Sequence, residues 1–179
     1  MKVLKWFLIA IVSLAAIFLV GGFMIPSTWT VTESATIKAS PETIYNQVAN
    51  LRNWQNWAPW NKEKDPTQVY TYEGPEVGPG ATWKWTSEKM GTGYLKILDG
   101  DVHQGIDYEL FIDMGDMQST MYGKMAFSAV DEGTHLVWTD KGESGNNLVK
   151  RWMSLMIKSM LSKEFKEGLA KLKSVTEAQ

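Results

Sequence analysis

The stretch Asn53-Trp54-Gln55-Asn56-Trp57-Ala58-Pro59-Trp60 places three tryptophans at intervals of three residues. At this spacing, Trp54, Trp57 and Trp60 fall on one side of a helical or 3₁₀ turn. In a structural interpretation the indoles fasten the preceding helix to the edge of a sheet, because each ring buries roughly 150–250 Å². In a functional interpretation some of them line the mouth of a cavity, since an indole has an apolar face and one polar N–H. The two interpretations are compatible.

The residues before this stretch predict a strand and then a helix. From Trp29 to Ile37 polar and apolar residues alternate, with Trp29, Val31, Ala35 and Ile37 on one face. Ser40-Pro41-Glu42 is a typical helix start, with a capping serine, a proline in the first turn and an acid near the positive end of the helix dipole. We expect this helix to run to about Leu51.

The residues after the tryptophans predict a succession of strands and a final long helix. Strands are expected over 69–72, 81–87, 93–98, 106–112, 117–130 and 134–140, with Asp99-Gly100 as a turn. The polar residues 144–147 cap a helix that we expect to run to about Val175. Its predicted apolar face consists of Val149, Trp152, Met153, Met156, Ile157, Met160, Leu161, Phe165, Leu169 and Leu172. Short connections between strands indicate an antiparallel sheet. The sequence therefore predicts an α+β fold in which a curved seven-stranded antiparallel sheet grips the long C-terminal helix.

The N-terminus predicts a membrane element. Residues 1–5 are basic, and from Trp6 to Ile25 no residue is charged. Twenty helical residues at ~1.5 Å each span the ~30 Å hydrocarbon core. A cleaved signal peptide is the rival interpretation, but no small-x-small site follows the apolar run. We expect residues 1–5 to be a cytoplasmic tail, 6–25 a single transmembrane anchor, 26–28 a linker, and 29–175 a domain outside the cell membrane, in the periplasm of a Gram-negative cell.

Composition excludes several kinds of chemistry. The 179 residues include no cysteine, which rules out disulfides, thiolate metal sites and a cysteine nucleophile. The formal net charge of -2 gives no support for nucleic-acid binding. No glycine-rich segment has a nucleotide-binding spacing, and Asp113 with Asp116 is more typical of a solvated turn than of a cation site. We therefore expect no cofactor and no metal.

The charges are unevenly distributed along the chain. Residues 27–146 carry 9 basic and 17 acidic side chains, whereas residues 147–175 carry 7 basic and 2 acidic ones. One interpretation is an ordinary solvated helix face that complements an acidic body. The other is that basic side chains hold the helix near anionic lipid, namely Lys150, Arg151, Lys158, Lys163 and Lys166.

In this order, the motifs resemble the START-like SRPBCC superfamily, and more narrowly its polyketide cyclase/dehydrase and lipid transport group. The resemblance covers about residues 29 to 175 and is carried by segments 37–42, 53–60, 80–85, 91–93, 133–138 and 165–173. It implies the helix-grip fold with an internal cavity. It also implies binding of lipids, sterols, polyketides or other apolar molecules, with cyclisation or dehydration in some members. A shared fold does not choose among these activities.

If the predicted inner faces converge, they form an apolar cavity that binds a hydrophobic small molecule or lipid. Methionine and aromatic side chains suit such a wall because they impose few hydrogen-bond requirements. The candidate lining residues are Trp57, Trp60, Trp83, Trp85, Tyr108, Leu110, Met121, Met125, Phe127, Trp138, Met153, Met156 and Met160.

Two alternatives to simple ligand binding remain open. A cyclase- or dehydratase-like enzyme would use an acid/base in the cavity, for which Tyr94, Tyr108 and Glu109 are candidates. A domain with a filled core would instead be an interaction module for an envelope partner. An ionisable group beside an open cavity favours the enzyme, a wholly apolar cavity favours ligand binding, and a filled interior favours the module.

Overall fold

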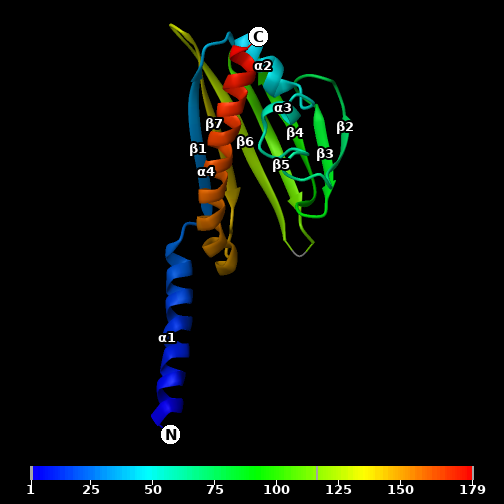
Figure 1. The fold of residues 1–179 in the computed structure, drawn as a ribbon. Helices are drawn as coiled ribbons and strands as arrows, with labels where there is room; N and C mark the ends of the chain where they lie inside the picture. Colours follow the sequence, from blue (N-terminus) through cyan, green and yellow to red (C-terminus); the bar gives the residue numbers. More distant parts are fainter. Residues whose placement is uncertain (1, 116, 179) are drawn as a thin grey trace.

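The computed structural model describes residues 2–115 and 117–178, as four helices and seven strands (Figure 1). The N-terminal helix is α1 (Lys2–Met24), and strand β1 (Thr28–Ile37), helix α2 (Pro41–Ala49) and the short helix α3 (Trp54–Trp57) follow it. Six strands come next: β2 (Val69–Glu73), β3 (Thr82–Ser87), β4 (Gly91–Asp101), β5 (Gly105–Asp113), β6 (Gln118–Val130) and β7 (Gly133–Glu143). The chain closes with α4 (Leu148–Glu177). The order of elements is the predicted one.

All seven strands form one antiparallel sheet in the order β1-β7-β6-β5-β4-β3-β2. Strand β1, the first to be made, joins the sheet beside β7, the last. Figure 1 shows α4 lying along the sheet on the β1 side, with α2 and α3 over the other part of the same face. The core lies between this face and the helices. This is the helix-grip architecture that the sequence predicts, and it is confirmed.

Local sequence explains where the helices begin. The Ser40 side chain accepts a hydrogen bond from the backbone N–H of Thr43 at 3.3 Å, and Pro41 opens α2. The Asn147 side chain accepts from the backbone N–H of Lys150 at 3.1 Å and opens α4. Each cap satisfies one N–H that has no partner inside its helix.

The predicted turn at Asp99-Gly100 is wrong. Both residues belong to β4, which continues past an irregularity between Ile97 and Asp99 and pairs with β5 as far as Asp101. The chain reverses at 102–104, where the Asp101 carboxylate accepts the backbone N–H groups of His103 at 2.9 Å and Gln104 at 3.0 Å. An Asp–Gly pair favours a turn, but strand pairing overrides that preference here.

Two of the three clustered tryptophans have a structural role. Trp54 and Trp57 are fully buried. The Trp54 indole N–H donates to the carbonyl of Val48 at 2.8 Å, and that of Trp57 donates to the carbonyl of Gln47 at 3.3 Å. Both acceptors lie in the last turn of α2, where carbonyls have no partner inside the helix. The indoles therefore fasten α2 to the core.

The predicted apolar face of α4 is wider than the face that the structure buries. From Leu161 onward Leu161, Phe165, Leu169 and Leu172 are buried against the sheet. Before Leu161, Met153 and Ile157 are half-buried, whereas Val149, Met156 and Met160 are exposed. The N-terminal end of α4 contacts α1 (Figure 1).

Helix α1 extends away from the domain (Figure 1). Its residues Val3–Met24 are long and apolar enough to cross a membrane, and few of them are buried. By length and composition such a helix is either a membrane anchor or a signal sequence.

Candidate functional site

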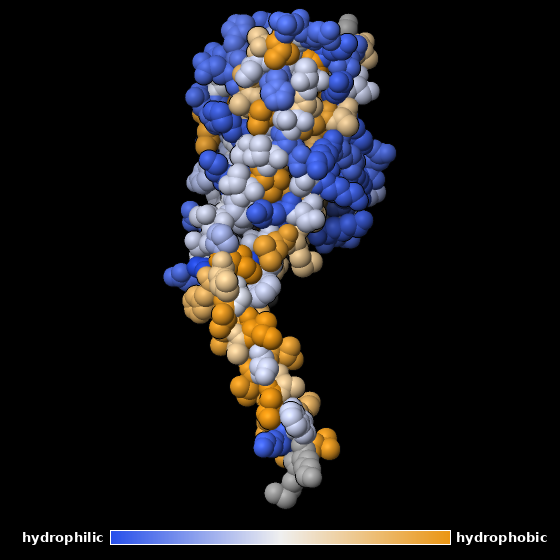
Figure 2. Space-filling model, turned by 90° about the vertical axis from the view of Figure 1, so that its left-hand side faces the viewer, coloured by the Kyte–Doolittle hydropathy of each residue, from blue (hydrophilic) through white to orange (hydrophobic). Residues whose placement is uncertain are grey.

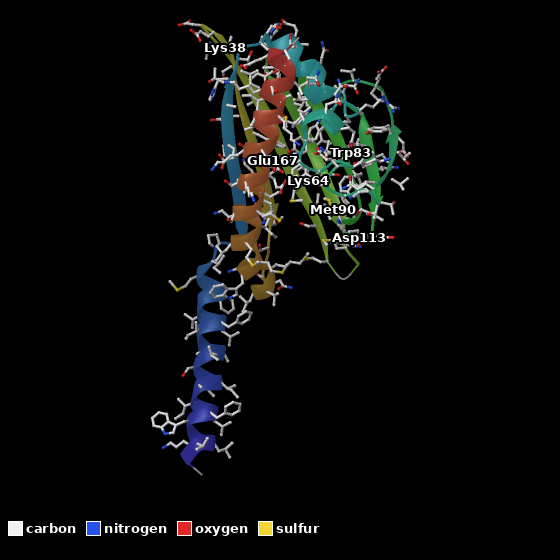
Figure 3. All side chains as sticks on the ribbon, in the orientation of Figure 1. Lys38, Lys64, Trp83, Met90, Asp113 and Glu167 are labelled. Carbon is white, nitrogen blue, oxygen red and sulfur yellow. The ribbon has the colours of Figure 1, made fainter. Side chains whose placement is uncertain are left out.

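A cavity of about 360 Å³ opens between the sheet and α4. Strands β3, β4, β5 and β6 supply one wall, and α4 and the segment after α3 supply the other. Figure 3 shows Trp83 on the inner side of the sheet, with Met90 towards the end of the domain nearer α1. The lining residues are Trp60, Gln68, Trp83, Trp85, Lys89, Met90, Leu95, Tyr108, Leu110, Ile112, Met114, Met121, Met160, Leu161 and Glu164. The volume lies within the range of about 300–1,000 Å³ that is typical of small-molecule sites.

The cavity wall is apolar, and several of its polar groups are already paired. The Glu164 carboxylate forms an ion pair with Lys64 at 3.2 Å, and Lys64 also reaches Glu167 at 2.8 Å (Figure 3). The Gln68 amide contacts the sulfur of Met90 at 3.3 Å and accepts a hydrogen bond from Tyr70. Such a wall favours hydrocarbon, with polar chemistry confined to the rim.

Two hydrogen-bond donors in the wall lack partners. Trp83 and Trp85 are 3% and 7% exposed, and neither indole N–H has an acceptor among residues 2–115 and 117–178. Buried donors are nearly always satisfied by protein, water or ligand. An acceptor such as a carbonyl or ester oxygen on a bound molecule is a suitable partner for an indole N–H that faces the cavity.

A second cavity of about 190 Å³ adjoins the first at the N-terminal half of α4. The two share Ile112, Met114, Met121, Met160 and Leu161. The second is lined in addition by Met117 and Met153. The two adjoining linings are both rich in methionine.

A buried acid lies behind the wall of the larger cavity. The Tyr108 hydroxyl donates to the Asp140 carboxylate at 2.5 Å and accepts from the Trp138 indole N–H at 2.7 Å. Burial raises the pKa of Asp140 to about 7, although the bond from Tyr108 opposes this shift. Burial, with the neighbouring Asp140, raises the pKa of Tyr108 well above its usual value. Tyr108 therefore stays protonated, and its hydroxyl is held by Asp140 and Trp138.

The sequence of residues 28–177 matches the family of polyketide cyclase / dehydrase and lipid transport proteins. The chain belongs to this family. No curated protein matches the sequence as a whole.

Solved structures with the family's fold are similar to this chain at low sequence identity. One is protein CV1439 from Chromobacterium violaceum, with a TM-score of 0.59, 14% identity, and coverage of 83% of this chain and 96% of that one. Another is protein MLL2253 from Mesorhizobium loti, with a TM-score of 0.61, 12% identity, and coverage of 84% and 98%. A third is the Aha1 dimer from Colwellia psychrerythraea, with a TM-score of 0.55, 18% identity, and coverage of 83% and 96%. At these identities the likeness establishes the fold alone.

The structure brings most of the predicted lining residues of this family member to the two cavities. The larger one is lined by Trp60, Trp83, Trp85, Tyr108, Leu110, Met121 and Met160, and the smaller one also by Met153. Four predicted residues lie in the core outside both linings, namely Trp57, Met125, Phe127 and Trp138. Trp138 is stacked on Phe165 with ring centroids 4.0 Å apart, which leaves no space for a ligand between them. Met156 is exposed on the outer side of α4.

Sequence reasoning missed several lining residues. Leu95 and Ile112 lie on strand faces whose alternation could have indicated them. Met90 and Met114 lie in connections between strands, where no periodicity marks the inward direction. Gln68 lies just before β2 and is polar, so an apolar pattern could not select it.

The other chemical candidates lie away from the cavity. Tyr94 donates to Glu109 at 2.6 Å, outside both cavity linings, so this pair does not meet the predicted acid/base position. Among residues 2–115 and 117–178 no three potential ligands gather to hold a metal ion. Asp116, predicted to lie in a solvated turn, is outside the described residues.

Proposed function

We propose that this protein is a membrane-anchored carrier that binds a hydrophobic small molecule or lipid between its sheet and α4 without changing it chemically. The observation that carries the proposal is the cavity of about 360 Å³ lined by methionine and aromatic side chains. Its size and apolar wall suit a hydrocarbon ligand. Membership of a family described by lipid transport supports the same ligand class.

In this proposal α1 is an uncleaved anchor. Lys2 and Lys5 are the only basic residues before Lys38, so the positive-inside rule orients the N-terminus to the cytoplasm and the domain to the outer side. The Arg151 guanidinium supports retention of α1, because it donates to the carbonyl of Ile25 at 3.2 Å and so links the end of α1 to the domain.

The experiment uses the full chain in lipid nanodiscs that contain a phospholipid with a photoreactive diazirine on its acyl chain. After illumination we expect crosslinked peptides that contain Met121, which lines both cavities. Leu110→Trp places a larger side chain in the cavity and should reduce this crosslink. Val130→Trp, on the exposed end of β6, is the matched control. A wild-type chain that crosslinks only through α1 contradicts the proposal.

Catalysis is the second candidate, and Tyr108 is the residue that favours it. Its ring lines the cavity, and its hydroxyl contacts Asp140, whose pKa is near neutrality. Such a pair is a typical acid/base arrangement. Tyr108→Phe distinguishes the two functions. A carrier should keep most of its lipid crosslinking, whereas an enzyme should lose turnover of a polyketide substrate and keep binding.

The interaction-module alternative is less well supported, because it requires a filled interior. The described residues leave two adjoining cavities beside α4. An exposed apolar face does exist on α4, and its continuity with the apolar α1 favours a membrane over an envelope protein as its partner.

A further inference from the structure

The N-terminal half of α4 carries an apolar stripe that the described part of the chain leaves largely uncovered. Val149, Trp152, Met156 and Met160 follow one another at spacings of three, four and four, so they lie on one side of the helix. Val149, Met156 and Met160 are 56%, 76% and 56% exposed, and the adjacent Leu155 is 48% exposed. Three residues further on, the stripe ends at Lys163.

This stripe is continuous with α1. The Trp152 indole N–H donates to the carbonyl of Phe18 at 3.1 Å, and the two rings are stacked with centroids 6.2 Å apart. A Cβ at Gly21 would lie 2.6 Å from the Trp152 ring, so only glycine allows this approach. Figure 2 shows the apolar surface of α1 continuing onto the adjoining end of the domain.

The contact with α1 fixes the depth of α4 in a bilayer. The apolar residues Val3–Met24 rise about 33 Å along the helix axis, close to the ~30 Å hydrocarbon core. Phe18 lies six residues before Met24, about 9 Å below the end of α1. Trp152 contacts Phe18 and Gly21, so its ring lies about 5–9 Å below the end of α1, in the outer part of the hydrocarbon, when α1 spans the bilayer. The residues of α4 that follow Trp152 then rise through the boundary, where tryptophan and other amphipathic side chains are enriched in membrane proteins.

The same part of α4 borders the cavities. Met160 belongs to the stripe and lines both cavities, and Met153 and Ile157 line the smaller one from the adjacent side of the helix. The connection between β5 and β6 supplies Met114 and Met117 to the opposite wall. An unbroken apolar surface therefore leads from α1 along α4 into the larger cavity.

We propose that residues 148–160 of α4 lie in the membrane–water interface and form the opening through which a lipid acyl chain passes from the bilayer into the cavity. This inference rests on the proposed function and narrows its ligand to a membrane lipid taken from the leaflet on the side of the domain. A helix with an apolar face and flanking basic residues binds in this interface. Lys163 follows the stripe on the same side of α4 and is exposed, so it can meet lipid phosphates.

The depth of spin labels in the bilayer tests the placement of α4. Because the sequence contains no cysteine, one introduced cysteine gives a single labelling site. Spin labels are attached to Met156→Cys in the stripe and to Ala170→Cys, a control exposed on the same helix, in the full chain. In nanodiscs of phosphatidylethanolamine and phosphatidylglycerol, we expect the label at 156 to be accessible to oxygen and protected from a water-soluble nickel chelate. The label at 170 should show the reverse. Equal access of the chelate to both labels overturns the inference.

A third label separates this inference from the anchor. Val12→Cys lies in the middle of α1 and is exposed in the structure. If the label at position 12 is in the hydrocarbon and the label at position 156 is in water, α1 is a membrane anchor but α4 does not lie in the interface. If both labels are in water, α1 is not an anchor, and the placement of α4 in the interface is contradicted as well.

The passage of lipid is tested with charges on the stripe. Leu155→Glu with Met156→Glu should slow photo-crosslinking of the diazirine phospholipid at Met121 about tenfold, the effect of about 1.4 kcal/mol. Ala170→Glu with Ser174→Glu is the matched control on the same helix. Unchanged crosslinking in the first variant contradicts the inference alone, whereas absent cavity crosslinking in the wild type contradicts the proposed carrier function.

Discussion

At the scale of single residues, the least expected feature is a carboxylic acid in an aromatic core. Asp140 is fully buried, and its second carboxylate oxygen has no hydrogen-bond partner among the described residues. Gly123 leaves the space for it, since a Cβ there would lie 2.4 Å from the Asp140 carboxylate and 2.0 Å from the Tyr108 ring. Ionising such a group is costly, because burial favours its neutral form.

This acid predicts how stability changes with pH. The pKa of Asp140 is raised from 3.8 to about 7 in the folded protein. The contribution of the neutral Asp140 carboxyl to the free energy of unfolding is therefore fully present below about pH 4 and is lost as pH rises through 7. One pKa unit corresponds to about 1.4 kcal/mol, so the loss should reach up to about 4 kcal/mol. Asp140→Asn should remove this part of the pH dependence. Urea unfolding of both proteins between pH 4 and 8 measures the free energy of unfolding at each pH. If the two proteins show the same dependence on pH, the prediction is contradicted.

The structural tryptophan gives a second prediction at this scale. Trp54→Phe removes the donor to the Val48 carbonyl and part of a buried ring, so we expect the free energy of unfolding to fall by about 2–4 kcal/mol. Trp60→Phe, at the partly exposed cavity wall, should cost about 1 kcal/mol or less. Circular dichroism during urea titration compares the two. Equal losses would show that Trp54 has no special role in fastening α2.

At the scale of elements, α4 has two environments along one helix. Its C-terminal half packs against the sheet through Leu161, Phe165 and Leu169. Its N-terminal half packs against α1 through Leu148, Arg151 and Trp152. The glycine pair Gly21-Gly22 makes that second contact possible, because small residues let helices approach closely where they meet in lipid.

The glycine contact is testable. Gly21→Val should separate α1 from Trp152, since even a single added Cβ would lie 2.6 Å from the ring. We expect faster amide hydrogen exchange over residues 25–28 and 148–155 in nanodiscs, with the rest of the domain unchanged. Ala15→Val, on the exposed surface of α1, is the control. Unchanged exchange in the Gly21 variant would mean that the contact does not stabilise these segments.

Sequence periodicity is sufficient to predict the helices and strands, but not which of their side chains are buried and which are exposed. Alternation identified the strands and the inward residues Trp83, Tyr108 and Met121, because one face of the sheet is buried. It could not show that Val149 and Met156 are exposed, since an apolar side chain on a helix predicts burial whether or not a neighbour covers it. It also could not find Met90 and Met114, whose direction depends on loop geometry.

At the scale of the whole molecule, the domain and α1 are nearly separate structures. No residue of α1 belongs to the hydrophobic core cluster among the described residues, and α1 meets the domain mainly at α4. The fold of the domain is therefore specified by the part of the chain that follows α1.

This separation predicts that a fragment of residues 26–179 folds without the anchor. The fragment keeps the carbonyl of Ser27, which accepts the backbone N–H of Ser144 at 2.7 Å and closes the sheet beside α4. We expect its melting temperature to lie within about 4 °C of that of the full chain, the shift that corresponds to about 1 kcal/mol or less. Differential scanning calorimetry measures both. A fragment without a cooperative transition would show that α1 is part of the folding unit.

The pairing of β1 with β7 sets the order in which the molecule can be completed. Thr28 pairs with Glu143 and Ile37 with Thr134, so the neighbour of the first strand in the sheet is the last strand to be synthesised. Until then its apolar face, with Trp29 and Val31, has no sheet to join. Such sequence-distant pairing slows folding and exposes the nascent chain to aggregation. The pairing of β1 with β7 should therefore be a late step in the folding of this domain.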